Sequence, residues 1–167
     1  MSDTKVSKIE ETINDKLIDR SRENALNFVN FLRECNITNE RNDFQLYRDE
    51  EVCSFMFFGK KLWYIGWSNS DITDGDNTNV CKELIKFARA KRYECKKCEG
   101  DGCNKNPGGI KKIFGKEYQN LCNSTVLFRC PSGETLEKIK QLVQYRIRDI
   151  ERKVDGTRGL SPCIIKI

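Results

Sequence analysis

The chain contains no histidine among its 167 residues. Histidine is the commonest general base in enzymes and is required for Ser-His-Asp and Cys-His nucleophile pairs, so its absence excludes both mechanisms. Catalysis would have to use carboxylates, lysines or tyrosines, with Glu50, Glu51 and Glu117 as candidates. We therefore expect a protein that binds a ligand rather than one that catalyses a reaction.

Long apolar runs are also absent, since no stretch approaches the roughly 18 residues that a helix needs to cross a bilayer. The first residues, Met1-Ser-Asp-Thr-Lys-Val6, are polar and charged and lack the apolar centre of a signal peptide. We expect a cytoplasmic protein with no membrane partner. With 38% hydrophobic and 33% charged residues, the chain has the composition of a globular protein, and its length fits a single domain over residues 1–167.

Cysteine, by contrast, is abundant, and four of the nine cysteines form the pattern C-x₂-C-x₄-C followed by one further cysteine. In a reducing compartment such clusters hold metal more often than they form disulfides. Zinc accepts four thiolates in a tetrahedron, and a C-x₂-C turn brings two of them to one ion. We predict a structural Cys₄ zinc site in a loop over residues 95–122, with Cys122 itself in a turn. The predicted ligands are Cys95, Cys98, Cys103 and Cys122.

Other interpretations of the cysteines stay open. Cys130 could replace Cys122 as the fourth ligand, although it ends an apolar strand and is expected to pack there. Four cysteines also suit an iron–sulfur cluster. Cys95 and Cys98 could instead form a redox pair, but the βαβ setting of thioredoxin-like proteins is missing. The remaining cysteines lie in apolar patterns and are predicted to be small core residues: Cys35, Cys53, Cys81 and Cys163.

Hydrophobic spacing predicts the elements of the fold. Apolar residues recur every three or four positions through residues 1–35, which indicates two helices with a break near residues 19–21. Residues 36–43 are polar and rich in turn formers. Residues 44–68 contain three aromatic and β-branched runs with short polar connections, which is typical of an antiparallel meander.

The second half of the chain adds further elements. We predict a helix from about residue 80 to 92, strands at 111–114 and 124–130, and a long C-terminal helix over 132–154. The fold class is therefore α+β. We expect an antiparallel sheet, made of the meander plus one to three further strands, packed by the N-terminal, central and C-terminal helices.

Two groups of side chains could bind a ligand. Trp63 and Trp67 share one face of a strand, where they either belong to the core or stack on a ligand. Residues 80–117 carry 11 Lys or Arg against 5 Asp or Glu, so a basic surface could bind the phosphates of a nucleic acid. The phosphate-binding candidates are Lys86, Arg89, Lys96, Lys97, Lys111 and Lys112.

The segment from Ile113 to Ser124, IFGKEYQNLCNS, together with the loop from Cys95 to Cys103, resembles a group of small bacterial proteins to which no activity is attached. This resemblance implies no catalytic or binding residues. The sequence favours a zinc-stabilised binding module that recognises a protein or a small molecule. A nucleic-acid-binding protein is the alternative, and an enzyme working without histidine is a second alternative.

Overall fold

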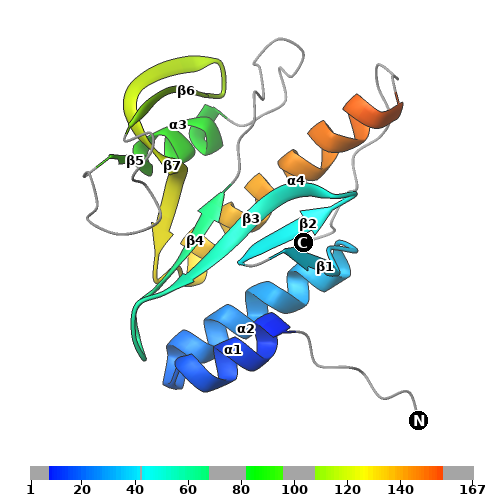
Figure 1. The fold of residues 1–167 in the computed structure, drawn as a ribbon, viewed down its shortest axis with the longest axis vertical. Helices are drawn as coiled ribbons and strands as arrows, with labels where there is room; N and C mark the ends of the chain where they lie inside the picture. Colours follow the sequence, from blue (N-terminus) through cyan, green and yellow to red (C-terminus); the bar gives the residue numbers. More distant parts are fainter. Residues whose placement is uncertain (1–7, 42, 68–81, 96–107, 156–167) are drawn as a thin grey trace.

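The computed structural model describes residues 8–41, 43–67, 82–95 and 108–155, and it shows the predicted α+β fold (Figure 1). Two helices precede a run of antiparallel strands, a short helix stands in the middle, and a long helix follows the last strand. The elements are α1 (Lys8–Lys16), α2 (Asp19–Glu34), β1 (Asn39–Arg41), β2 (Phe44–Tyr47), β3 (Glu50–Phe57), β4 (Trp63–Trp67), α3 (Lys82–Ala90), β5 (Arg92–Glu94), β6 (Gly109–Ile113), β7 (Lys116–Arg129) and α4 (Gly133–Asp155).

The strands form one 7-stranded antiparallel sheet in the order β1-β2-β3-β4-β7-β5, with β6 paired to β7 as well. The predicted meander over 44–68 is confirmed as β2, β3 and β4. Strand β1 was not predicted, because residues 36–43 are polar and resemble a turn region. Strand β7 also begins well before the predicted strand at 124–130. Within the described residues, no helix is both long and apolar enough to cross a membrane.

The predicted break between two N-terminal helices is confirmed at Leu17 and Ile18. Asp19 has a positive φ of 50°, which redirects the chain between α1 and α2. The Ile18 N–H donates to the Lys60 carbonyl at 3.1 Å, and the Ser21 hydroxyl donates to the Lys61 carbonyl at 3.2 Å. These bonds fix the start of α2 on the turn between β3 and β4.

Two of the β-hairpins close through two-residue turns in which both residues have positive φ. Arg48 and Asp49 (φ 49° and 65°) join β2 to β3, and Phe114 and Gly115 (φ 47° and 73°) join β6 to β7. This is the type I′ geometry, whose twist matches that of paired strands. Glycine and aspartate tolerate positive φ, whereas phenylalanine is unusual there. The Phe114 ring is buried and stacks on Trp67, which explains its place in the turn.

The helices pack on one face of the sheet. Phe28 of α2 packs edge-on against Phe55, and Phe87 of α3 stacks on Phe128. From α4, the Leu142 carbonyl accepts a hydrogen bond from the Trp67 indole N–H at 3.2 Å. Strand pairing puts these sheet residues on the same face, because Phe55 lies opposite Ile65 and Ile65 lies opposite Phe128. Ile9 and Ile13 of α1 belong to the same buried cluster, so the four described helices share one core with the sheet.

The opposite face of β3, β4 and β7 differs in character. Cross-strand pairs Ser54–Gly66, Met56–Tyr64 and Tyr64–Arg129 put these side chains on that face, together with Leu127 opposite Gly66. Met56, Tyr64 and Leu127 are half-buried and Phe58 is exposed, and none of them belongs to the core cluster or is packed against it. We call this surface the open face and define it by Ser54, Met56, Phe58, Tyr64, Leu127 and Arg129.

Candidate metal centre

Strand pairing brings Cys95 beside the part of β7 that carries Cys122. The Cys95 N–H donates to the Asn120 carbonyl at 2.8 Å, and Glu94 of β5 lies opposite Leu121 of β7. Cys122 is the next residue along β7. Its side chain is 9% exposed, and that of Cys95 is half-buried. Cys122 therefore lies on β7, and Cys95 directly follows β5, the strand that pairs with this part of β7.

Cys122 lies in a bulged strand and not in a turn, so that part of the prediction was wrong. Arg92 pairs with Val126 while Glu94 pairs with Leu121, so β7 has extra residues between these two points. The Lys111 ammonium donates to the Cys122 carbonyl at 3.2 Å and to the Thr125 hydroxyl at 3.3 Å. A bulge leaves backbone groups without ladder partners, and Lys111 satisfies one of them.

The residues that flank the segment with the other two predicted ligands, Cys95 and Gly108, lie close together. Cys98 and Cys103 themselves lie outside the described residues, between Cys95 and Gly108. A Cβ built on Gly108 would stand 3.2 Å from the Cys95 Cβ and would collide with the Asn120 side-chain oxygen. The two ends of the segment are therefore packed side by side against β7, next to the residue that precedes Leu121 and Cys122.

Gly108 has a φ of 67°, so its place beside Cys95 also depends on glycine's backbone freedom. We predict that Gly108→Ala lowers the free energy of unfolding by about 1–2 kcal/mol, through backbone strain and the collision with Asn120. Gly109→Ala is the matched control, because nothing lies within 4 Å of a Cβ at Gly109. Urea denaturation of both variants measures the difference, and equal effects would contradict the packing described here.

The alternative fourth ligand, Cys130, follows the other end of β7. Its N–H donates to the Trp63 carbonyl at 2.8 Å, and its Sγ lies 3.3 Å from the Lys61 carbonyl. Ten positions of the chain separate it from Asn120, the partner of Cys95. In the strand register, Cys122 is therefore much nearer to Cys95 than Cys130 is, because Asn120 precedes Cys122 by two residues. Among the residues described, no three histidine, cysteine, aspartate or glutamate side chains gather into a metal site.

Two other described cysteines, Cys35 and Cys53, pack as small apolar side chains. Cys53 is fully buried in the core, and this burial raises the pKa of its thiol far above the usual value. Cys35 is half-buried and packs against the same core. Both positions agree with the predicted role as core residues. Cys81 and Cys163 lie outside the described residues.

Neither tryptophan offers a surface for ligand stacking. Trp63 and Trp67 are each 1% exposed. Trp63 stacks on Phe55, and Trp67 stacks on Phe114 while its indole N–H binds the Leu142 carbonyl. Both rings belong to the core, which is one of the two roles considered for them, and do not form a stacking surface.

The predicted phosphate-binding residues do not form one surface of available cations. The Arg89 guanidinium donates to the backbone carbonyls of Ile113 and Phe114, which ties α3 to the β6–β7 turn. Lys111 supports the bulge at Cys122. Lys86 and Lys112 are exposed. Lys96 and Lys97 lie outside the described residues.

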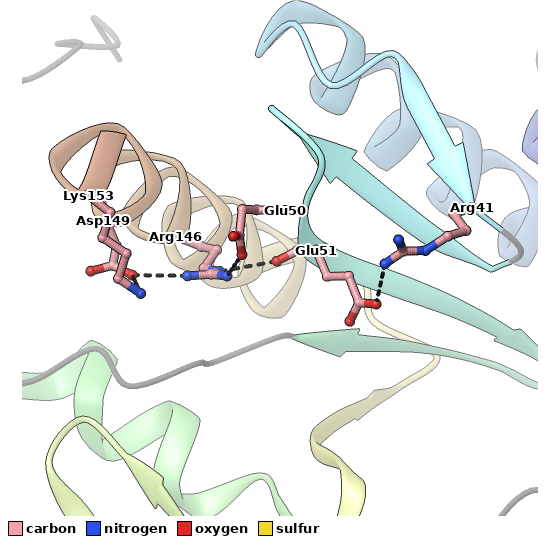
Figure 2. Close-up of polar contacts among 6 residues, drawn as sticks. All are labelled: Arg41, Glu50, Glu51, Arg146, Asp149 and Lys153. Carbon is pink, nitrogen blue, oxygen red and sulfur yellow. Dashed lines mark hydrogen bonds and ion pairs between the residues drawn. The ribbon is translucent and has the colours of Figure 1, made fainter. Parts of the chain in front are cut away.

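A buried arginine on α4 lies at the centre of a polar cluster (Figure 2). Arg146 is 1% exposed. Its guanidinium donates to the Glu51 carbonyl at 3.1 Å, to Asp149 at 3.0 Å and to Glu50 at 3.2 Å. The side chain of Glu51 turns away and pairs with Arg41 at 3.0 Å. The cluster joins α4 to the β2–β3 hairpin, so Glu50 and Glu51 have structural partners.

Sequence reasoning missed this cluster, although a signal was present. Arg146 follows Val143 by three residues and precedes Ile150 by four, so it lies on the apolar stripe of α4. Asp149 stands one further turn along the same side. Beside this cluster, the Tyr47 hydroxyl donates to Glu151 at 2.8 Å, and burial together with that hydrogen bond raises the pKa of Tyr47.

The chemistry available at β5 and β7 is that of thiolate ligation. Cys95 and Cys122 are the described donors, and a site completed by Cys98 and Cys103 would bind zinc with no open position for water or substrate. Comparison with known proteins adds no further information on the activity. No protein-family model, curated protein sequence or solved structure matches this chain.

Proposed function

We propose that this protein is a binding module stabilised by a structural zinc ion. The ion would be held by Cys95, Cys98, Cys103 and Cys122. A four-thiolate site supplies folding free energy and no catalysis, because every coordination position is taken by the protein. The ligand of the module is a protein, a small molecule or a nucleic acid, and we place the protein in the cytoplasm, where unpaired cysteines persist.

The observation that carries this proposal is the pairing of β5 with β7. It puts Cys95 beside Asn120, which precedes Cys122 by two residues. Gly108, which follows the segment 96–107, lies at the same place. Bringing the two ends of a 12-residue segment together costs conformational entropy. A metal bound by Cys95 before the segment, by Cys98 and Cys103 within it and by Cys122 of β7 would offset that cost.

The charge near the site also suits thiolate ligands. A zinc ion with four thiolates carries two negative charges, which nearby cations stabilise. The Lys111 ammonium donates to the backbone carbonyl of Cys122 and to the side-chain hydroxyl of Thr125, and it is part-buried there. An ammonium held beside a ligand's own backbone would offset part of the negative charge without acting as a ligand.

Metal analysis of the purified protein, prepared without chelator, tests the proposal. We expect about one zinc ion per chain by elemental mass spectrometry. Cys95→Ser and Cys122→Ser should each lose most of the zinc and lower the melting temperature, because an oxygen in place of a thiolate weakens the site and apo zinc sites lose folding free energy.

Cys130→Ser is the matched control, since it removes a half-buried thiol from the same strand at the end away from Cys95. It should keep the zinc. Loss of zinc in Cys130→Ser but not in Cys122→Ser would contradict the assignment of the fourth ligand. A wild-type chain with no bound metal and with reactive thiols would contradict the zinc site altogether. Iron and acid-labile sulfide in place of zinc would indicate a cluster.

A further inference from the structure

The open face carries an aromatic pair, an exposed Phe58 and a half-buried Tyr64. Phe58 is 66% exposed, and its ring meets that of Tyr64 edge to face, with centroids 5.4 Å apart and planes at 83°. Among the described residues, Phe58 belongs neither to the core cluster nor to the side chains packed against it. An edge-to-face pair leaves ring faces available for a third planar group.

The charges around this pair are basic. Arg129 lies directly opposite Tyr64 on the same face and is exposed, and Lys60 and Lys61 occupy the turn that follows Phe58. Lys61 meets Asp19 at 3.4 Å, but both side chains are 70% exposed, so the pair is weak. Within the described part of the chain, the side chains of Lys60 and Arg129 form no ion pair.

The acidic side chains of β3 lie at its opposite end. Glu50 pairs with Arg146 and Glu51 pairs with Arg41, so both are neutralised there. Among the described residues, the part of the open face around Phe58 and Tyr64 therefore combines an exposed ring and a half-buried ring with a local excess of positive charge. Protein interfaces are depleted in lysine, whereas single-stranded nucleic acids are bound by aromatic rings that stack on bases beside cations that track the phosphates.

We infer that the open face binds single-stranded nucleic acid. Phe58 and Tyr64 would stack on successive bases, and Lys60 and Arg129 would contact the backbone phosphates. This inference deepens the proposed role as a binding module and uses neither the cysteines nor the basic residues of α3 and β6. Stacking reads the faces of bases and not the sugar, so DNA and RNA of one sequence should bind alike, and a duplex should bind more weakly.

Fluorescence anisotropy with a labelled, mixed-sequence single-stranded oligonucleotide at low salt tests the inference on the full chain. Phe58→Ala should weaken binding by about 5- to 150-fold, the range measured for removing one stacking ring. Ile110→Ala is the matched control, because Ile110 is 65% exposed on β6 and away from the open face. It should leave the dissociation constant unchanged.

Arg129→Ala should weaken binding to every sequence and reduce the slope of log Kd against log salt concentration by about one. Lys86→Ala removes one exposed charge from α3 and should have little effect. No binding by the wild type at low salt would overturn the inference, as would equal effects of Phe58→Ala and Ile110→Ala, or a larger effect of Lys86→Ala than of Arg129→Ala. Zinc content, measured on the same samples, tests the proposed metal site separately from this surface.

Discussion

Replacing Glu50 with glutamine and Asp149 with asparagine together should lower the free energy of unfolding by about 3–5 kcal/mol. The reason is that Arg146 is the buried member of the cluster, with a side chain 2% exposed, whereas Glu50 is 58% and Asp149 18% exposed. Removing both carboxylates leaves a buried guanidinium without a counter-charge. A guanidinium cannot lose its proton at ordinary pH, so the protein must bear the cost in stability.

Arg146→Met should cost less, about 1–2 kcal/mol, since it removes the buried charge and keeps most of the apolar stem. The carboxylates left behind reach water, and Asp149 keeps Lys153 at 3.2 Å. Glu51→Gln serves as the control, because its pair with Arg41 is exposed and should contribute no more than about 1 kcal/mol. Urea denaturation of the three variants measures the order of their losses in the free energy of unfolding. A cost for Arg146→Met equal to that of the double variant would show that the cluster does not depend on its buried charge.

The elements with strong periodicity could be predicted from the sequence. Helix α4, the break between α1 and α2, and strands β2 to β4 all follow from repeating apolar positions, because their buried faces dictate where apolar residues must stand. The N-terminal half of β7 could not be predicted in this way. Residues 116–120 are almost wholly polar, and they form a strand because the turn at Phe114 and Gly115 pairs them with β6.

The candidate site, like the fold, could be predicted from the sequence only in part. Residue type and spacing were enough to select the C-x₂-C-x₄-C cysteines and to leave Cys122 and Cys130 as alternatives. The argument for Cys122 as the fourth ligand uses the register of β5 on β7. That register depends on a bulge that could not be predicted from the sequence pattern. The open face could not be predicted either, because alternation along β3 and β4 shows two faces but does not show which of them the helices cover.

Phe114→Ala should lower the free energy of unfolding by about 3–5 kcal/mol, a large effect for a residue in a two-residue turn. Its ring is 1% exposed and stacks on Trp67 at 5.4 Å, with Tyr145 of α4 edge-on at 5.7 Å. The turn carbonyls of Ile113 and Phe114 also accept hydrogen bonds from Arg89 of α3. Phe114 therefore anchors the β6–β7 hairpin, and with it the bulge that holds Cys122, to the core.

Ile110→Ala changes an exposed side chain on the same hairpin and should shift stability by less than about 0.5 kcal/mol. Thermal and urea denaturation compare the two variants. Because the chain has two tryptophans, a Trp63→Phe background leaves Trp67 as the single indole, and its emission should move to longer wavelength in Phe114→Ala as its stacking partner is lost. If Phe114→Ala lowers the zinc content but still unfolds in one cooperative transition, the result would show that the Phe114 ring helps to position Cys122. An unchanged melting temperature and emission would instead show that the hairpin is held by its strand pairing and not by the buried ring.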